Sequence, residues 1–212
     1  MAYPPPPYHV TDQDAAIRLM GAHPFAHLFT SHCGLRVTRV PFVADCENGR
    51  PVRLRAHLHA RNPQAQGLDG APVLIAFSGP ATYVSPHWRA DKTRGGTYDY
   101  EEVQVRGTAS IVSDVGFFRR LLDDLSALIE PQHAEIGDYP VWQTSMAPEG
   151  YIERLFPGVT PFVVAIDTVE TIFKLHQDFP EADRRSVADH LARSRRDESR
   201  TIAEEIRRQI DG

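Results

Sequence analysis

Hydrophobic and polar residues alternate in many short segments of the chain, which is the pattern of half-buried β-strands. The clearest segment is 52–59, in which four apolar residues alternate with two arginines and two histidines. Similar patterns predict further strands at residues 25–30, 35–43, 72–77, 82–85, 100–112, 162–166 and 169–175. Asn48-Gly49 predicts a hairpin turn. Gly79-Pro80 predicts a break between the strands at 72–77 and 82–85, and Gly107 predicts an interruption of the strand at 100–112.

Apolar residues at helical spacing predict helices between and after these strands. The clearest helix covers residues 114–129, with Asp114 as its N-cap. A first helix is expected over residues 11–21, and a short one is expected after Pro148. Residues 181–212 read as a charged helical tail, in which eight acidic residues balance eight arginines.

This order of elements predicts an α+β domain built on an antiparallel sheet or barrel. The strands are arranged mostly as hairpins, and few helices separate them. No glycine-rich segment joins a strand to a helix, which excludes the Rossmann and P-loop nucleotide sites. We expect residues 1–180 to form the main domain, with the prolines at 4–7 as an extended arm, and residues 181–212 to form the tail.

Composition places the chain among ordinary globular proteins. Of its 212 residues 42% are hydrophobic and 24% are charged, which excludes a disordered, collagen-like or disulfide-scaffold protein. The net charge of −5 argues against a strongly basic nucleic-acid surface, and no apolar run is long enough to span a membrane. The N-terminus has no signal-peptide pattern, so we expect a cytoplasmic protein in which Cys33 and Cys46 are free thiols.

The first candidate binding segment is Arg55-Ala-His57-Leu-His59-Ala-Arg61-Asn62-Pro63. On an extended strand residues 55, 57, 59 and 61 share one face, which brings two arginines and two histidines together. Guanidinium groups suit a phosphate. The two histidines lack a third ligand at a suitable spacing, so we expect no metal site. A solvated strand face explains the same pattern, and this alternative stays open.

A second segment runs from Phe77 to Trp88 and is followed by Lys92. Its glycine–proline pair lets the backbone approach a ligand closely. Ser85, Trp88 and Lys92 then offer a hydroxyl, an aromatic ring and a cation, which suit a flat ligand that carries a phosphate. A structural turn with Trp88 in the core explains the segment equally well.

Two further segments add aromatic and polar groups. Residues 95–100 place Tyr98 and Tyr100 beside a flexible glycine pair, where a tyrosine can stack on a ligand ring or pack in the core. The stretch around Lys174 and Gln177 lies at the end of the last predicted strand. Neither segment identifies a ligand by itself.

Taken together, these segments make the chain resemble the PaiB family of FMN-binding negative transcriptional regulators. The resemblance covers most of the chain, and the order and spacing of its short segments make it specific. The matching residues include Pro24-Phe25-Ala26, His57-Leu58, Arg61-Asn62-Pro63, Gly79-Pro80, Tyr83-Val84-Ser85-Pro86, Trp88, Lys92, Tyr151-Ile152, Lys174-Leu175, Gln177 and Ala182-Asp183-Arg184.

The resemblance implies a split β-barrel of the pyridoxamine-phosphate-oxidase type over residues 1–180, paired as a homodimer with FMN at the subunit interface. FMN needs cations for its phosphate, a flat surface for its ring and polar groups at the ring edge. We expect Arg61 and Lys92 to bind the phosphate, with Arg55 as a weaker candidate. The other expected cofactor-binding residues are His57, Asn62 and Ser85 as hydrogen-bonding groups, Trp88 and Tyr100 against the ring, and Lys174 and Gln177 from late strands.

The chain departs from the family pattern in three places. The family usually has Pro-Thr-Trp-Asn-Tyr where this chain has residues 96–100, so Asp99 adds a negative charge. We therefore expect this loop not to bind the phosphate end of the cofactor. The family also usually has Ser where this chain has His176, and often a Ser-His-Leu-Pro type strand where this chain has residues 38–41.

Three functions remain open at this point. A flavin-binding regulator follows from the resemblance, although DNA contact has weak support because no helix-turn-helix reads clearly and acids dilute the arginines of the tail. A flavin-dependent oxidoreductase of the same barrel type is the alternative, with no identifiable catalytic base. The third is a protein that binds haem or another flat ligand through an axial histidine.

Overall fold

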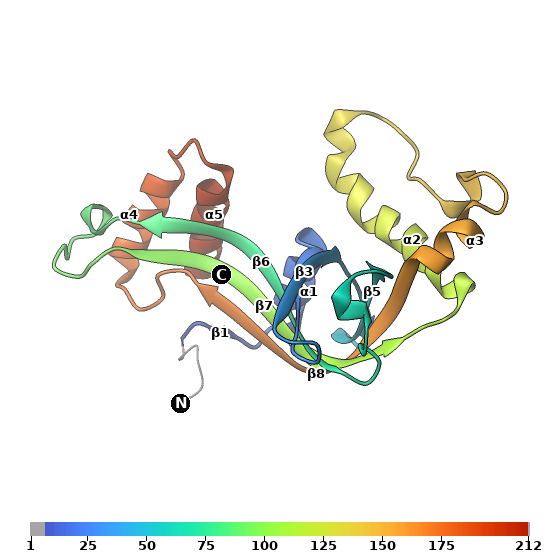
Figure 1. Cartoon of the computed structure of the whole chain (residues 1–212). Helices are drawn as coiled ribbons and strands as arrows, with labels where there is room; N and C mark the ends of the chain where they lie inside the picture. Colours follow the sequence, from blue (N-terminus) through green and yellow to red (C-terminus); the bar gives the residue numbers. More distant parts are fainter. Residues whose placement is uncertain (1–6, 212) are drawn as a thin grey trace. The chain divides into compact units, whose positions relative to one another are not determined.

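The described part of the chain, residues 7–211 of the computed structural model, contains eight strands that join in one antiparallel sheet (Figure 1). They are β1 (His9–Val10), β2 (Phe25–Thr30), β3 (Arg36–Pro41), β4 (Val43–Glu47), β5 (Arg50–His59), β6 (Pro72–Val84), β7 (Thr97–Ile111) and β8 (Val159–Lys174). Their order is β3-β2-β6-β7-β8-β5-β4, and β1 pairs with β8. Of the expected proline arm, residues 4–6 lie outside the described residues.

Five α-helices and five short 3-10 helices lie among the same residues. They are α1 (Gln13–Ala22), α2 (Val115–Ile129), α3 (Tyr151–Leu155), α4 (Glu181–Leu191), α5 (Asp197–Asp211), η1 (Pro63–Ala65), η2 (Pro86–Trp88), η3 (Glu130–Ile136), η4 (Thr144–Met146) and η5 (Phe156–Gly158). None of these helices combines the length and the hydropathy needed to cross a membrane.

The chain forms two compact units that share the long strands. Unit 1 contains the chain up to Asp12 with Ser78–Val103 and Glu170–Gly212, and unit 2 contains Gln13–Phe77 and Gln104–Val169. Strands β6, β7 and β8 therefore contribute one part to each unit. The tail helices belong to unit 1, together with the segment that begins at Ser78.

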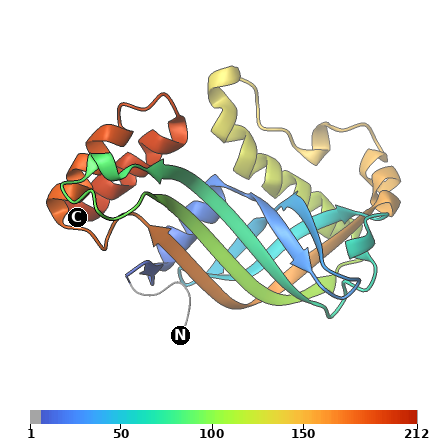
Figure 2. The same ribbon diagram turned by 60° about the vertical axis from the view of Figure 1, so that its left-hand side comes forward.

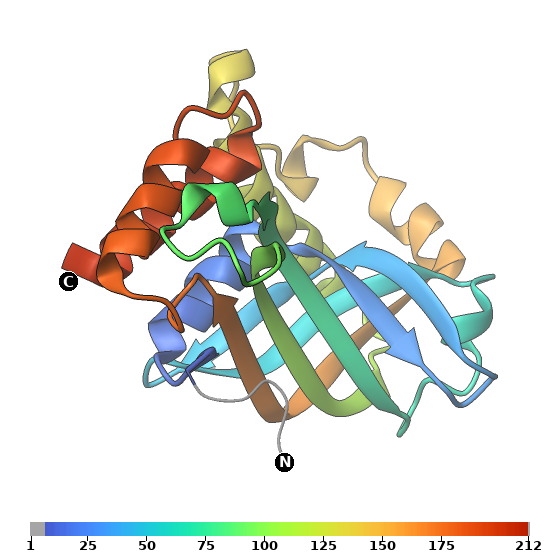
Figure 3. The same ribbon diagram turned by 90° about the vertical axis from the view of Figure 1, so that its left-hand side faces the viewer.

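In unit 2 the strands curl into a half-barrel with α1 and α2 beside it (Figures 2 and 3). Helix α1 contacts β4 and β5, and α2 contacts β4. Three phenylalanines form the centre of the core: the ring of Phe42 meets Phe77 at 5.8 Å and Phe162 at 6.1 Å, both edge-on. From α2 only Phe118, Leu121 and Leu125 are buried, a narrower stripe than its apolar residues suggest.

In unit 1 the helical tail supplies much of the core. Helices α4 and α5 pack against each other, and Figure 2 shows them side by side. Val187 and Leu191 from α4 and Ile202 and Ile206 from α5 are completely buried or nearly so. The apolar spacing expected in the tail is therefore the spacing of a packed helix pair.

Two of the expected strand breaks are wrong. The pairing of β2 with β6 covers Val73–Ala76, and Pro80 lies beyond it, so its missing N–H costs no hydrogen bond to β2. Strand β6 therefore continues through Gly79-Pro80. Residues 162–166 and 169–174 likewise belong to one strand, β8, and the two polar residues between them, Asp167 and Thr168, are both exposed.

Several local predictions are confirmed. Strand β2 has the expected bounds, and Asp114 caps α2 by accepting hydrogen bonds from the backbone N–H of Gly116 and Phe117. Asn48 and Gly49 both have positive φ, as a hairpin turn between two strands requires. Val52 is exposed although the alternation places it inside, because a register shift beside Cys46 leaves it out of the pairing with β4.

Gly107 lies inside β7 and does not interrupt it, since the residue allows a close approach of two strands. A Cβ atom there would stand 2.1 Å from the carbonyl oxygen of Ala165 in β8. We predict that Gly107→Ala lowers the free energy of unfolding by about 1–3 kcal/mol, because backbone must move to relieve the overlap. Urea denaturation measures this.

The matched control is Gly21→Ala in α1, where a Cβ atom meets nothing within 4 Å. This change should be neutral or stabilise the protein by up to about 1 kcal/mol, because alanine favours helix more than glycine does. Equal stability of the wild type and the Gly107 variant would contradict the close-approach explanation.

Candidate functional site

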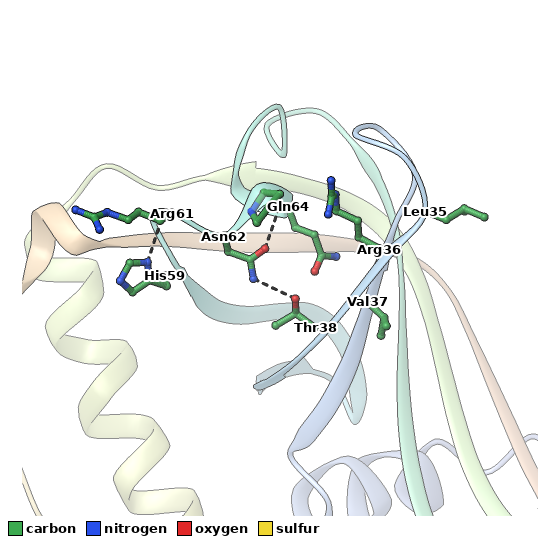
Figure 4. A pocket seen from close by; sticks show the side chains of 9 residues that line it. Leu35, Arg36, Val37, Thr38, His59, Arg61, Asn62 and Gln64 are labelled. Carbon is green, nitrogen blue, oxygen red and sulfur yellow. Dashed lines mark hydrogen bonds between the residues drawn. The ribbon is translucent and has the colours of Figure 1, made fainter.

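A pocket of about 610 Å³ lies in unit 2 between β3 and the turn after β5 (Figure 4). Its volume is within the range of small-molecule sites, about 300–1,000 Å³. The residues that line it are Leu35, Arg36, Val37, Thr38, His59, Arg61, Asn62, Pro63 and Gln64. Two of the residues expected from the sequence, Arg61 and Asn62, are therefore part of one pocket.

Asn62 fixes the shape of this pocket. Its Oδ1 accepts a hydrogen bond from the backbone N–H of Gln64 at 2.9 Å, and its Nδ2 donates to Oγ1 of Thr38 at 3.0 Å. The side chain thus caps η1, which has Pro63 at its first position, and ties this turn to β3. Both polar atoms of its amide are therefore used in hydrogen bonds within the protein.

The pocket is lined by cationic and hydrogen-bond-donating groups and by no carboxylate. Nδ1 of His59 accepts a hydrogen bond from the backbone N–H of Arg61 at 3.0 Å, so a neutral His59 ring carries its proton on Nε2. Figure 4 shows His59 and Arg61 on one side of Asn62 and Arg36 on the other. This arrangement favours an anionic ligand.

Gln64 contributes a buried acceptor to the same pocket. Its side chain is 1% exposed, and its Nε2 donates to the carbonyl oxygen of Leu28 and to Oγ1 of Thr30. Its Oε1 has no hydrogen-bond partner among residues 7–211. A buried acceptor without a donor is costly to the protein.

Arg55 and His57 lie on β5 but are used differently from Arg61. The Arg55 side chain is 12% exposed and forms ion pairs with Asp45 at 2.8 Å and with Asp124 of α2 at 2.7 Å. His57 packs edge-on against Phe118 of α2 at 5.4 Å, and burial lowers its pKa below the ordinary value of 6.5. His57 is therefore neutral at pH 7 and brings no charge to an anion.

The face shared by residues 55, 57, 59 and 61 ends earlier than expected. Strand β5 stops at His59, and Arg61 lies in the following turn. Helix α2 then covers the first part of this face and leaves only its end open. The expected cluster of two arginines and two histidines is therefore divided.

The remaining expected site residues belong to unit 1. Ser85 caps η2 by accepting a hydrogen bond from the N–H of His87, and Trp88 stacks on His190 at 5.6 Å. Lys92 is exposed in the loop after η2, and Tyr100 is half-buried on β7.

Lys174 and Gln177 are engaged with their own surroundings. Nζ of Lys174 donates to Oγ1 of Thr97 and to the carbonyl oxygen of Tyr98, the second at 2.6 Å. Oε1 of Gln177 accepts from the backbone N–H of Leu175 at 2.6 Å, and its Nε2 donates to the carbonyl oxygen of Phe173. Both side chains hold the end of β8 in place.

Two of the departures from the family pattern meet in the interior of unit 1. Nδ1 of His176 and Oδ2 of Asp99 form a hydrogen bond of 2.6 Å, and both side chains are 0% exposed. His176 also stacks on Phe179 at 4.4 Å. The added carboxylate of Asp99 is therefore a buried partner of the added histidine, and it does not face solvent.

No group of three or more His, Cys, Asp or Glu side chains suited to a metal ion occurs among residues 7–211. Cys33 and Cys46 are free and exposed.

The family follows from a comparison with known proteins. A family model described as "Putative FMN-binding domain" matches residues 2–168. The chain belongs to this family. FMN is accordingly the cofactor of the domain, as the resemblance in the sequence implied.

Relatives of known sequence extend this result. An uncharacterized protein of Aspergillus fumigatus is 30% identical over 199 residues, which cover 72% of this chain and 74% of the relative. The protease synthase and sporulation protein PAI 2 of Bacillus subtilis is 22% identical over 204 residues, which cover 95% of both chains.

Solved structures share the fold. The FAD and heme binding protein from Mycobacterium smegmatis aligns with a TM-score of 0.58 and 15% identity, covering 83% of this chain and 78% of that protein. The flavocytochrome Anf3 from Azotobacter vinelandii aligns with a TM-score of 0.55 and 18% identity, covering 78% and 69%. The expected α+β split-barrel fold is confirmed.

Sequence reasoning missed Arg36 and Thr38 as pocket residues. They stand two positions apart on β3, so they share one face of this strand. The same period-2 argument applied to residues 35–43 would have grouped them. It could not have shown that this face meets the turn that contains Asn62.

We predict that Asp99 and His176 are energetically coupled. Asp99→Asn and His176→Ser, which restore the family's usual residues one at a time, should each lower the free energy of unfolding by about 1–3 kcal/mol by leaving a buried polar group poorly paired. The double variant should be more stable than the sum of the two losses predicts, with a coupling of about 1 kcal/mol or more. Urea denaturation of the four proteins gives this value.

A matched cycle replaces His176→Ser with His87→Ser, which removes an exposed histidine of the same unit. This second cycle should be additive. Additivity in both cycles would show that the two departures are independent.

Proposed function

We propose that this protein holds FMN in the unit 2 pocket, with the phosphate bound by Arg61 and by Nε2 of His59. The observation that supports this proposal is that two arginines and a histidine line the pocket, and no carboxylate of the described residues does. The guanidinium fork of Arg61 matches phosphate oxygens, and Nε2 of His59 is free to donate a hydrogen bond because Nδ1 accepts one from the backbone. The residues present therefore fit the cofactor of the family.

The chain's own residues bind and orient the cofactor in this proposal. When bound, FMN supplies hydride and single-electron transfer. Asn62 acts as a positioning residue because its amide is used within the protein. Leu35 is 92% exposed and Val37 is 53% exposed, and both offer apolar surface beside the cations, as a flat ring requires.

We assign the other expected residues in three groups. Arg55 and His57 support the packing of α2 on β5, and Lys174 and Gln177 hold the end of β8. The third group lies in unit 1 and outside the unit 2 pocket: it comprises Ser85, which positions Trp88, together with Lys92 and Tyr100.

We predict that Arg61→Ala weakens FMN binding about 10- to 100-fold, because it removes a charge-assisted hydrogen bond. Arg50→Ala is the matched control: Arg50 begins β5, the strand that precedes Arg61, is exposed and does not line the pocket. Its affinity should equal that of the wild type. Flavin fluorescence titration at fixed ionic strength measures the FMN affinity of the wild type and both variants. An equal loss of affinity in both variants would show that Arg61 does not bind the phosphate.

We further propose that two copies of the chain form a homodimer through β2 and β3. Phe29 and Val37 lie opposite each other in this pair of strands and are 39% and 53% exposed, and Phe25 adds a side chain that is 50% exposed. An exposed apolar sheet face of this kind is typical of a protein interface.

Placing a charge on this face should separate the copies. We predict that Phe29→Glu shifts the protein to monomers in analytical ultracentrifugation at micromolar concentration. Tyr139→Glu is the control, because Tyr139 is 81% exposed and lies outside the sheet. A dimer that persists in both variants would exclude this face as the interface.

The regulatory role stays a prediction, supported by the similarity to PAI 2. DNA contact needs available basic groups, because phosphate contacts supply much of the affinity. In α4 and α5, Arg185 pairs with Glu181 and Asp211, and Arg207 pairs with Asp189. These pairs leave fewer arginines of the tail available to DNA, and a mobility-shift assay at low salt tests whether DNA is bound.

A further inference from the structure

A second pocket, of about 330 Å³, lies in unit 1 and contains no residue of the proposed flavin site. Thr82 of β6 and Ser199 of α5 line it, and their hydroxyl groups form a buried hydrogen bond of 2.8 Å. This bond ties the strand to the last helix. The pocket is therefore built by contacts that hold the tail in place.

Aromatic rings line the same pocket. The rings of Trp88 and His190 are stacked at 5.6 Å and 12°, and Nδ1 of His190 donates to the carbonyl oxygen of Ser186 at 2.7 Å. Tyr83 and Tyr98 meet edge-on at 5.8 Å and are 50% and 60% exposed. Exposed aromatic rings gathered at a hollow are typical of a ligand site.

The charges at this pocket have one sign. Arg193 and Arg196 line it, and no Asp or Glu does. Arg196 has an exposed pair with Glu198 at 3.2 Å, which contributes little stability. Arg193 forms no ion pair among the described residues, and the nearby Asp189, which attracts it, is paired with Arg207 at 2.8 Å. The Arg193 guanidinium is therefore available to an anion.

We propose that this pocket binds a small planar aromatic anion of one or two rings. The stacked and edge-on rings suit a flat aromatic face, and Arg193 suits a carboxylate or phosphate on its edge. The volume lies at the lower end of the range for ligand sites, which limits the ligand to this size. The stacked pair is held in position before binding, which lowers the entropic cost of binding.

The test uses the full-length protein saturated with FMN and isothermal titration with 2-naphthoate. Two comparison compounds test the need for the charge and for the aromatic ring separately. 2-Naphthamide lacks the negative charge, and decahydronaphthoate lacks the aromatic ring. We expect 2-naphthoate to bind at least about tenfold more tightly than either compound. Equal affinities for the three would overturn the proposed ligand class.

Variants locate the binding. Arg193→Gln should weaken 2-naphthoate binding about tenfold or more, as expected for loss of a charge-assisted hydrogen bond. Arg195→Gln removes an exposed arginine of the same loop that does not line the pocket, and should leave the affinity unchanged. Tyr98→Leu should weaken binding without loss of folding, since Tyr98 is largely exposed.

Two results would contradict a second site. Equal losses in the Arg193 and Arg195 variants would mean that the loop attracts anions without a defined pocket. Competition between FMN and 2-naphthoate, seen by repeating the titration without FMN, would assign this pocket to the flavin. The Arg61 variant keeps its 2-naphthoate affinity in our proposal, which makes failure of the flavin site distinguishable.

Discussion

Backbone pairing along β6, β7 and β8 is the constraint on which both units depend. These strands have 13, 15 and 16 residues, and each contributes to unit 1 and to unit 2. Buried backbone groups must be paired, so a break in any of them would leave donors and acceptors unsatisfied in the core. At Gly107 two of these strands come so close that a Cβ atom would meet the carbonyl oxygen of Ala165.

The polar side chains near the candidate sites divide into groups that build the protein and groups that stay available. Asn62 and the Nε2 of Gln64 are used within unit 2, and Lys174 is used in the same way within unit 1. Because these groups are satisfied internally, the pockets keep their shape without a ligand. The groups that stay available to a ligand are Arg61 and the donor nitrogen of His59 in the unit 2 pocket, and Arg193 with the exposed aromatic rings in the unit 1 pocket.

The sequence was informative where the signal is local. The N-cap of Asp114, the hairpin at Asn48-Gly49 and strand β2 depend on a few neighbouring residues, and all three were predictable. The continuity of β6 through Pro80 was not, because it depends on where β2 stops pairing. Arg55 likewise looked like part of a binding face, and only the packing of α2 shows that two carboxylates hold it.

The buried pair in unit 1 shows why a single departure from a family pattern is a poor guide to function. Read alone, Asp99 is a negative charge that would repel a phosphate. It lies 77 positions from His176 in the sequence, yet the two side chains share a hydrogen bond in the core of unit 1. Oδ2 of the buried carboxylate is hydrogen-bonded where it stands, so the effect of Asp99 is on the stability of unit 1. In our proposal the affinity for an anionic cofactor depends on other residues, the cations around Asn62 in unit 2, which lie within the part of the chain that matches the family.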